Sequence, residues 1–265
     1  MPDNTPRIIL LGDSLTQGGF QPDTKGYGWA LQRYYSTRAV VVNKGINGIT
    51  TESIRHHFNS ILTDITAPNA PPTKLFSIFL GANDGCLHPW GVPLPEFAAN
   101  MTAFVEKLTT HPALTGLKVV LIATPPINVR DADRDTSLGS VETAKKRAGW
   151  RNYVSKKTYA EKVMEIAQGF ENRGVEVVGV DLWGALVDAA LVDQGRGDEE
   201  GGRGDRRGKY EEERLPGCGL PDSREFPDGY FCDALHFEWK AYEVLTKVFQ
   251  ETVFAKWPEL QADRI

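Results

Sequence analysis

Cysteine is scarce in this sequence, and its spacing argues against two kinds of stabilised fold. The 265 residues include three cysteines, Cys86, Cys218 and Cys232, an odd number without any C-x-x-C pair. A disulfide framework uses an even set of cysteines, and the common zinc sites need closely spaced Cys or His ligands. We therefore expect free thiols and no metal site.

Long apolar runs and a strong charge of either sign are also missing. Residues 1 to 6 contain no apolar signal region, and no apolar run approaches the length that crosses a bilayer. The formal net charge of -5 at pH 7 is mildly acidic, which argues against a nucleic-acid partner. We expect a soluble, cytoplasmic protein with no membrane and no nucleic-acid partner.

The glycine-rich start of the chain lacks the spacing of a nucleotide site. The segment Gly12-x5-Gly18-Gly19 matches neither Gly-x-Gly-x-x-Gly nor the P-loop with its lysine. A phosphate- or nucleotide-binding module is therefore disfavoured.

What the chain does contain is a regular alternation of apolar strand-length runs with helical segments. The predicted strands are Ile8–Gly12, Ala39–Asn43, Lys74–Leu80, Lys118–Thr124 and Val175–Asp181. The predicted helices are Gly26–Arg38, Thr50–Thr66, Pro93–Thr110, Ala148–Arg173 and Phe237–Lys256. Such alternation predicts an α/β fold with a parallel sheet covered on both faces, and the length of 265 residues suits one domain. Strand order stays open at this point.

Two groups of charged residues need a separate interpretation. Residues 194 to 214 are almost entirely Gly, Asp, Glu, Arg and Lys, so they cannot bury a core, and we expect a flexible charged insertion on the surface. A basic group precedes it in the chain: Lys145, Lys146, Arg147, Arg151, Lys156 and Lys157. Such a group can hold an anionic substrate, but a solvated helix face is the preferred interpretation.

Ser14 stands directly after the first predicted strand. Ile8–Gly12 is apolar throughout, as expected of a strand buried on both faces, and Asp13 and Ser14 follow at once. Ligands bind at the carboxyl edge of open α/β sheets, so Ser14 is a candidate nucleophile. The structural alternative is a helix cap, because Ser and Asp are both favoured at that position.

Three further loops supply the other groups that acyl transfer requires. His236 can take the proton of Ser14, and Asp233 can orient the imidazole. The backbone N–H groups of Ser14 and Gly48 and the side-chain amide of Asn83 can form an oxyanion hole. Each residue also has a purely structural alternative: a hydrogen bond at the start of a helix for Asp233 and His236, and turn positions for Asn83 and Gly48.

Four short blocks carry these residues: Gly12-Asp13-Ser14-Leu15, Gly48, Gly81-Ala82-Asn83-Asp84 and Asp233-x-x-His236. Together they resemble the blocks of the GDSL, or SGNH, hydrolase family of esterases and lipases. The resemblance implies a flavodoxin-like α/β/α sandwich with a parallel sheet of about five strands. It also implies a serine carboxylic ester hydrolase without a cofactor.

Three less specific motifs indicate a subfamily. Val92-Pro93-Leu94, Thr124-Pro125-Pro126 and Tyr159-Ala160 are similar to segments of isoamyl acetate-hydrolysing esterases, which implies short-chain, acetate-type esters as small-molecule substrates. A carbohydrate O-deacetylase, a lysophospholipase or a thioesterase on the same site is the alternative. From a different class, a non-catalytic interaction protein on the esterase scaffold also stays open. The oligomeric state stays open as well, a homodimer included.

Overall fold

Five parallel strands form the sheet at the centre of the protein. The computed structural model describes residues 4–87, 91–129, 152–197, 215–219 and 223–265. The strands are β1 (Arg7–Gly12), β2 (Val40–Gly45), β3 (Thr73–Phe79), β4 (Lys118–Ile122) and β5 (Val177–Val180). Their order is β2-β1-β3-β4-β5, and every neighbouring pair is parallel. This is the flavodoxin-like order, with the change of direction between β1 and β3, and it confirms the predicted fold class.

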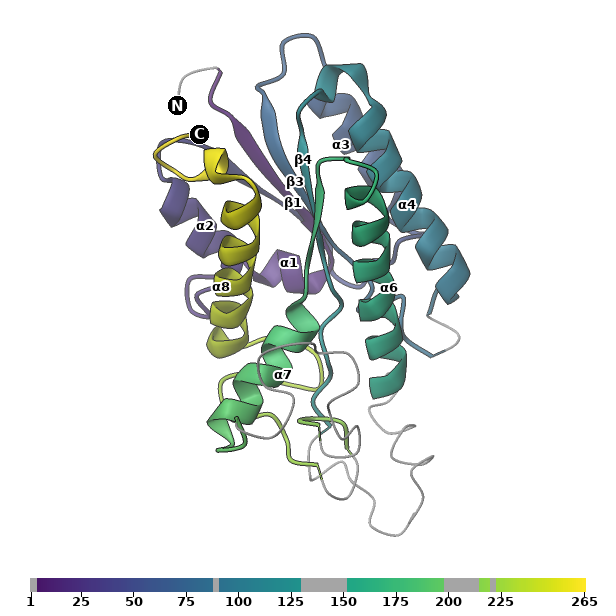
Figure 1. Cartoon of the computed structure of the whole chain (residues 1–265), viewed down its shortest axis with the longest axis vertical. Helices are drawn as coiled ribbons and strands as arrows, with labels where there is room; N and C mark the ends of the chain where they lie inside the picture. The colour runs from purple at the N-terminus through teal and green to yellow at the C-terminus, as the bar shows by residue number, and fades with distance from the viewer. Residues whose placement is uncertain (1–3, 88–90, 130–151, 198–214, 220–222) are drawn as a thin grey trace.

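Helices lie on both sides of the sheet (Figure 1). One side carries α2 (Tyr27–Tyr35) and α8 (Trp239–Lys256), and the other carries α3 (Arg55–Ile65), α4 (Leu94–Thr110) and α6 (Tyr153–Glu171). At the carboxyl ends of the strands lie α1 (Ser14–Gly18) and α7 (Leu182–Asp193). Two short 3-10 helices complete the described elements, η1 (Pro112–Leu114) and η4 (Pro258–Leu260).

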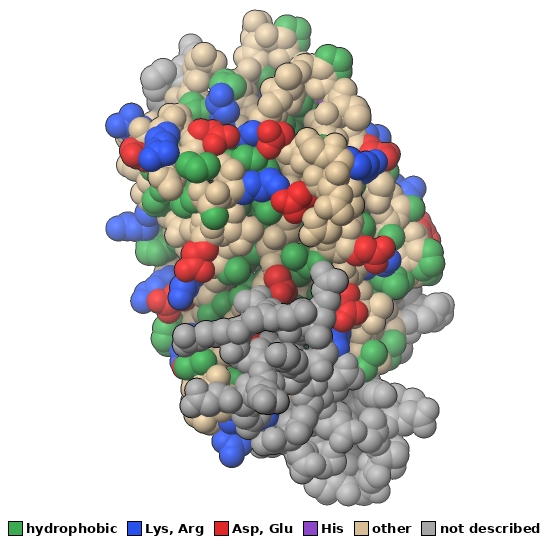
Figure 2. Space-filling view, viewed as in Figure 1, with side chains coloured by type: hydrophobic (Ala, Val, Ile, Leu, Met, Phe, Trp, Pro, Cys, Tyr) green, Lys and Arg blue, Asp and Glu red, His purple; other side chains and the backbone are tan. Residues whose placement is uncertain are grey.

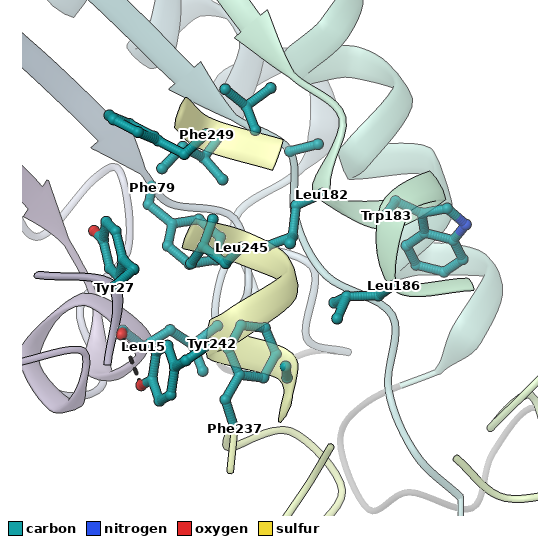
Figure 3. Packing of buried hydrophobic residues seen from close by; sticks show 14 of the residues in the cluster. Leu15, Tyr27, Phe79, Leu182, Trp183, Leu186, Phe237, Tyr242, Leu245 and Phe249 are labelled. Atoms are coloured by element: carbon teal, nitrogen blue, oxygen red, sulfur yellow. Dashed lines mark hydrogen bonds between the residues drawn. The ribbon is translucent and has the colours of Figure 1, made fainter. Parts of the chain in front are cut away.

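The alternation of side chains along β1 explains the two layers of core. Ile8 and Leu10 belong to the cluster under α2 and α8, whereas Ile9 and Leu11 belong to the cluster under α3, α4 and α6. Successive side chains of a strand point to opposite faces, so an unbroken apolar run fills both cores at once. The first cluster is the larger and includes the aromatic packing shown in Figure 3.

Two helices differ from the prediction. The helix expected from Thr50 begins at Arg55, because the backbone and hydroxyl of Thr51 bond to Asp84 and hold the preceding residues in turns. Helix α7 was not predicted: it follows β5 with only Asp181 between them, and the Asp181 side chain caps it by accepting from the Gly184 N–H. An almost wholly apolar helix joined to a strand without a turn shows no boundary in the sequence.

Parts of the other predicted segments lie outside the described residues. Helix α6 begins at Tyr153, with Asn152 as its cap, and the expected start of that helix at 148 to 151 is outside them. Of the predicted insertion, residues 194 to 197 are described, and Gln194 caps α7. Within the described ranges, none of the helices has both the length and the apolar character needed to span a bilayer.

Candidate active site

Ser14 is the first residue of α1, at the carboxyl end of β1. The helix cap is Asp13, whose Oδ1 accepts from the Leu15 N–H at 2.9 Å, so the alternative in which Ser14 serves as the cap is wrong. Because Asp13 performs the capping, the hydroxyl of Ser14 is available for another contact.

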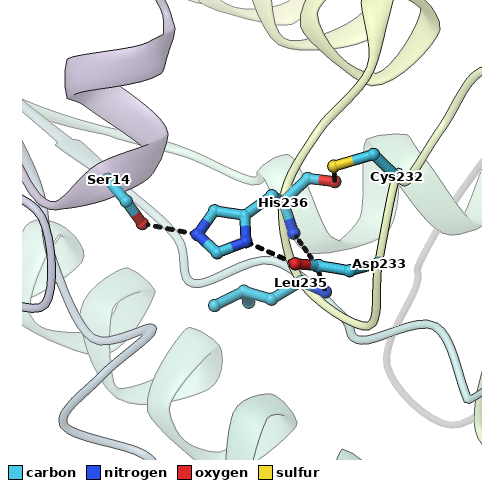
Figure 4. A network of polar contacts seen from close by, with 5 residues as sticks. All are labelled: Ser14, Cys232, Asp233, Leu235 and His236. Atoms are coloured by element: carbon cyan, nitrogen blue, oxygen red, sulfur yellow. Dashed lines mark hydrogen bonds and ion pairs between the residues drawn. The ribbon is translucent and has the colours of Figure 1, made fainter.

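That contact is with His236, 222 positions later in the chain (Figure 4). The Ser14 Oγ lies 3.1 Å from His236 Nε2, and His236 Nδ1 lies 2.7 Å from an Asp233 carboxylate oxygen. Hydroxyl, imidazole and carboxylate therefore form a continuous line of hydrogen bonds. The structure brings together all three residues that were predicted to form a triad.

The loop of Asp233 and His236 is held by its own backbone. The Asp233 Oδ1 accepts from the N–H groups of Leu235 and His236, both at 2.7 Å, while Oδ2 faces the imidazole. The bridge between Phe231 and Phe237 closes the loop. Burial favours the protonated carboxyl, but the hydrogen bonds from His236 and Leu235 outweigh it and hold the pKa of Asp233 below its ordinary value. The carboxylate is charged at neutral pH and can stabilise an imidazolium.

Helix α8 connects this loop to the start of α1 through Tyr242. The buried Tyr242 hydroxyl donates to the Leu15 carbonyl at 2.9 Å, as Figure 3 shows. Phe237 packs edge-on against the Tyr242 ring, at 5.3 Å between centroids. The residue after His236 and the residue after Ser14 are thus joined through one buried side chain.

The two predicted oxyanion loops meet beside α1. Asn83 follows β3, and its Nδ2 donates to the Ile49 carbonyl at 2.9 Å. An amide nitrogen carries two hydrogens, so this bond fixes the side chain while leaving a second donor. Gly48 has φ of +72°, a left-handed conformation that favours glycine, and a Cβ there would meet no described atom within 4 Å. The loop of Gly48 rests on α1 through the Asn47 N–H, which donates to Gln17 Oε1 at 3.0 Å.

Comparison with known proteins places this arrangement in a family. The family model described as "GDSL-like Lipase/Acylhydrolase family" matches residues 10–244. The chain belongs to this family. The predicted enzyme class is thereby confirmed, and the GDSL protein is a carboxylic ester hydrolase.

Relatives of this GDSL protein include named esterases. An isoamyl acetate-hydrolyzing esterase of Saccharomyces cerevisiae is 25% identical over 72% of this chain and 80% of its own length. A GDSL esterase/lipase of Arabidopsis thaliana is 30% identical over 68% of this chain and 72% of its own length. Among solved structures, the lipase/acylhydrolase from Enterococcus faecalis superposes with a TM-score of 0.56 at 19% identity, over 95% of this chain and 96% of that one. At that identity the superposition shows a shared fold.

A largely buried polar network that the sequence analysis missed connects the loops of Gly48 and Asn83. The Asp84 Oδ1 accepts from the backbone N–H and from the hydroxyl of Thr51, and the Thr51 Oγ1 accepts from Asn100 Nδ2 at 3.1 Å. Arg55 donates in turn to Asn100 Oδ1. This network joins the loop after β2 to the loop after β3, so the two loops are fixed relative to each other.

Two carboxyl groups in this buried region are perturbed. Burial raises the pKa of Asp13 to about 7, a change reinforced by the nearby charge of Asp84 and opposed by the Leu15 N–H, Lys156 and His236. Burial also raises the pKa of Asp84, although the hydrogen bonds from Thr51 oppose the change. Each carboxyl has an Oδ2 atom that accepts no hydrogen bond from the described residues. Burial therefore disfavours the charged form of both carboxyl groups.

Lys156 contradicts the interpretation of the basic group as a solvated helix face. Its side chain is fully buried and donates to the Ala82 carbonyl of the Asn83 turn, whereas residues 145 to 147 and 151 lie outside the described residues. The signal was available in the helical period, because Lys156 falls on the same stripe as the buried Tyr153, Tyr159 and Val163.

Two further features of the described residues concern their charged and metal-ligating side chains. On the face in Figure 2, basic and acidic side chains are interspersed over the described elements without a large patch of one sign. Among the described residues, no group of three or more His, Cys, Asp and Glu side chains is arranged to hold a metal ion.

Proposed function

We propose that this GDSL protein hydrolyses short-chain acyl esters, of the acetate type, through a covalent acyl-Ser14 intermediate. The observation that carries the proposal is the line of hydrogen bonds from the Ser14 hydroxyl through His236 to the Asp233 carboxylate. In this arrangement Ser14 is a nucleophile with the base His236 in reach, and Asp233 orients that base. Covalent acyl transfer needs these three parts.

In the first half-reaction, Ser14 Oγ attacks the carbonyl carbon of the ester while His236 Nε2 takes the hydroxyl proton. The negative charge that develops on the carbonyl oxygen faces the proposed donors: the N–H groups of Ser14 and Gly48 and the free amide hydrogen of Asn83. Asp233 stabilises the imidazolium. Collapse of the tetrahedral intermediate breaks the ester bond, and His236 returns the proton to the departing alcohol.

In the second half-reaction a water molecule takes the place of the alcohol. His236 accepts a proton from this water as its oxygen attacks the acyl-Ser14 carbonyl, and the same oxyanion donors act again. Collapse of the second intermediate releases the carboxylic acid and returns the proton to Ser14 Oγ. Two chemical steps of the same kind therefore need only one set of residues.

The preference for a small acyl group rests on the relatives. The Saccharomyces cerevisiae protein is named for hydrolysis of isoamyl acetate, and its similarity extends over most of this chain. This supports acetate-type esters over long-chain lipids as the substrate class of the present chain.

The test is hydrolysis of p-nitrophenyl esters from acetyl to dodecanoyl by the wild type, by Ser14→Ala and by a matched control, Ser60→Ala. Ser60 is exposed on α3, on the opposite side of the sheet from α8. We expect turnover to be greatest for acetyl or butyryl and kcat to fall about 10⁴- to 10⁶-fold in Ser14→Ala only.

Each other result has a defined meaning. Near-normal turnover in Ser14→Ala would contradict the serine mechanism. A maximum at dodecanoyl would favour a lysophospholipase. A wild type inactive on every p-nitrophenyl ester is next assayed on acetylated sugars and thioesters: activity there would favour a deacetylase or a thioesterase, and none would favour a non-catalytic role.

A further inference from the structure

Lys156 is a buried cation that the proposed chemistry leaves without a role. Its exposed fraction is 0%, and among the residues that the structure describes no other Lys or Arg is buried. Placing an ammonium group out of contact with water is unfavourable unless nearby groups compensate its charge. We therefore look for neighbouring groups that interact favourably with the positive charge.

The first of these neighbours is the turn that carries Asn83. The Lys156 Nζ donates to the carbonyl oxygen of Ala82, the residue directly before Asn83, and lies 3.8 Å from the Cys86 Sγ. Ser155, the preceding residue of α6, donates its hydroxyl to the Gly85 carbonyl at 2.9 Å. Two consecutive side chains of α6 therefore donate hydrogen bonds to the carbonyl groups of this turn.

Two further groups that Lys156 affects are the buried carboxyl groups of Asp13 and Asp84. Lys156 lowers the pKa of Asp13 and of Asp84, against the larger opposite effect of burial. Asp13 is next to Ser14 in the chain, and Asp84 is next to Asn83. The buried ammonium thus acts on the residues next to both the proposed nucleophile and the proposed oxyanion donor.

We propose that Lys156 is a positioning residue for the ester hydrolysis proposed above, holding the Asn83 amide in place through the Ala82 carbonyl and offsetting the buried charges of Asp13 and Asp84. The inference rests on the proposed function, because only a developing oxyanion makes the precise placement of that amide matter. A donor that acts on the oxyanion stabilises the transition state more than the bound ester, so its displacement lowers kcat more than it changes KM.

The experiment compares Lys156→Met with Lys157→Met on p-nitrophenyl acetate. Methionine keeps an unbranched side chain of similar length without the charge, and Lys157 is the next residue of the same helix, partly exposed and 4.0 Å from Glu161. We expect Lys156→Met to lower kcat about 10- to 100-fold with KM changed less than about threefold, and Lys157→Met to match the wild type.

A double-mutant cycle separates positioning from a general loss of stability. If Lys156 acts through Asn83, Lys156→Met lowers kcat much less in an Asn83→Ala background than in the wild type. An equal fall of kcat in both backgrounds, or a fall in urea stability with kcat unchanged, would overturn the positioning role.

A second variant covers the case in which Lys156→Met does not fold. Adding Asp13→Asn removes one of the charges that Lys156 offsets, and we expect the pair to withstand more urea than Lys156→Met alone. The kcat of the pair is then compared with that of Asp13→Asn, and the same 10- to 100-fold deficit, about as large as for a partly misplaced oxyanion donor, is expected. A pair no more stable than the single variant would contradict the charge offset.

Ser14→Ala in the same assay tells the two proposals apart. Loss of turnover in Ser14→Ala with normal kcat and KM in Lys156→Met would leave the proposed function standing and remove the role of Lys156. Normal turnover in Ser14→Ala would remove both.

Discussion

Two sets of ionisable groups belong to the region of Ser14, and they differ most in their exposure to water. The side chains of Asp233 and His236 are 53% and 41% exposed, whereas Asp13 and Lys156 are at most 1% exposed. The pKa of Asp233 is held low by hydrogen bonds, but the pKa of Asp13 is raised to about 7 by burial. The exposed set is suited to exchanging protons with a substrate, and the buried set is suited to fixing the loops that surround it.

This difference predicts opposite responses to mutation. Removing an exposed group takes away a step of the chemistry while leaving packed contacts in place. Removing a buried group changes stability first, and changes the chemistry through the position of a loop. Kinetic and stability measurements on the same variants therefore test the comparison.

The largest effect on kcat is expected at Asp233, the exposed end of the hydrogen bonds that run from Ser14 through His236. Asp233→Asn should lower kcat about 10³- to 10⁴-fold, because an amide no longer holds the imidazole in the productive tautomer. Stability should change little, since the amide oxygen can still accept from the N–H groups of Leu235 and His236. The matched control is Asp228→Asn, an exposed aspartate five positions earlier. If Asp233→Asn instead lost activity because the protein unfolded, the exposed and buried sets would not differ in the way proposed.

Asp13→Asn should reveal the buried set through pH. A carboxyl whose pKa is raised from 3.8 to about 7 binds its proton more tightly in the folded state. Its contribution to stability is therefore complete below pH 3.8 and is lost as the pH rises to 7, by up to about 4 kcal/mol. The free energy of unfolding of Asp13→Asn, measured in urea from pH 5 to pH 8, should lack this fall. Parallel pH curves for the wild type and the variant would contradict a strained Asp13.

Asn83→Ala tests the group that links the two sets. Loss of one oxyanion donor should lower kcat about 100- to 1000-fold with little change in KM. Asn83→Asp is the informative companion, because it retains the size but replaces the donor with a charge that repels the oxyanion. If both variants kept wild-type kcat, Asn83 would be no more than a turn residue.

The smallest effect is expected from Thr51→Val, which leaves Asp84 without the hydroxyl that it accepts from. We expect a loss of about 1 to 3 kcal/mol in the free energy of unfolding and a fall in kcat no larger than that of Asn83→Ala. Thr63→Val on the exposed face of α3 serves as the control. A change in kcat without any change in stability would show that the network does not act through the fold.

The same contrast explains what could be predicted from the sequence. The strand β1 is an unbroken apolar run, and Asp233 and His236 lie three residues apart on one loop, so each is visible in a short window. Lys156 was misread because its role depends on α6 packing against a turn more than 70 positions earlier. Thr51 and Asn100 were missed for the same reason, since their contacts join separate loops. The roles of Ser14, Gly48, Asn83, Asp233 and His236 stay predictions.

The central claim is that the acyl group passes through Ser14. The most direct measurement is mass spectrometry of the protein quenched in acid during turnover of p-nitrophenyl acetate, followed by identification of the modified peptide. The account predicts one added acetyl group on Ser14, lost on longer incubation and absent in Ser14→Ala. An acetyl group carried instead by the exposed Cys232, or turnover with no acetylated protein at any time, would contradict it.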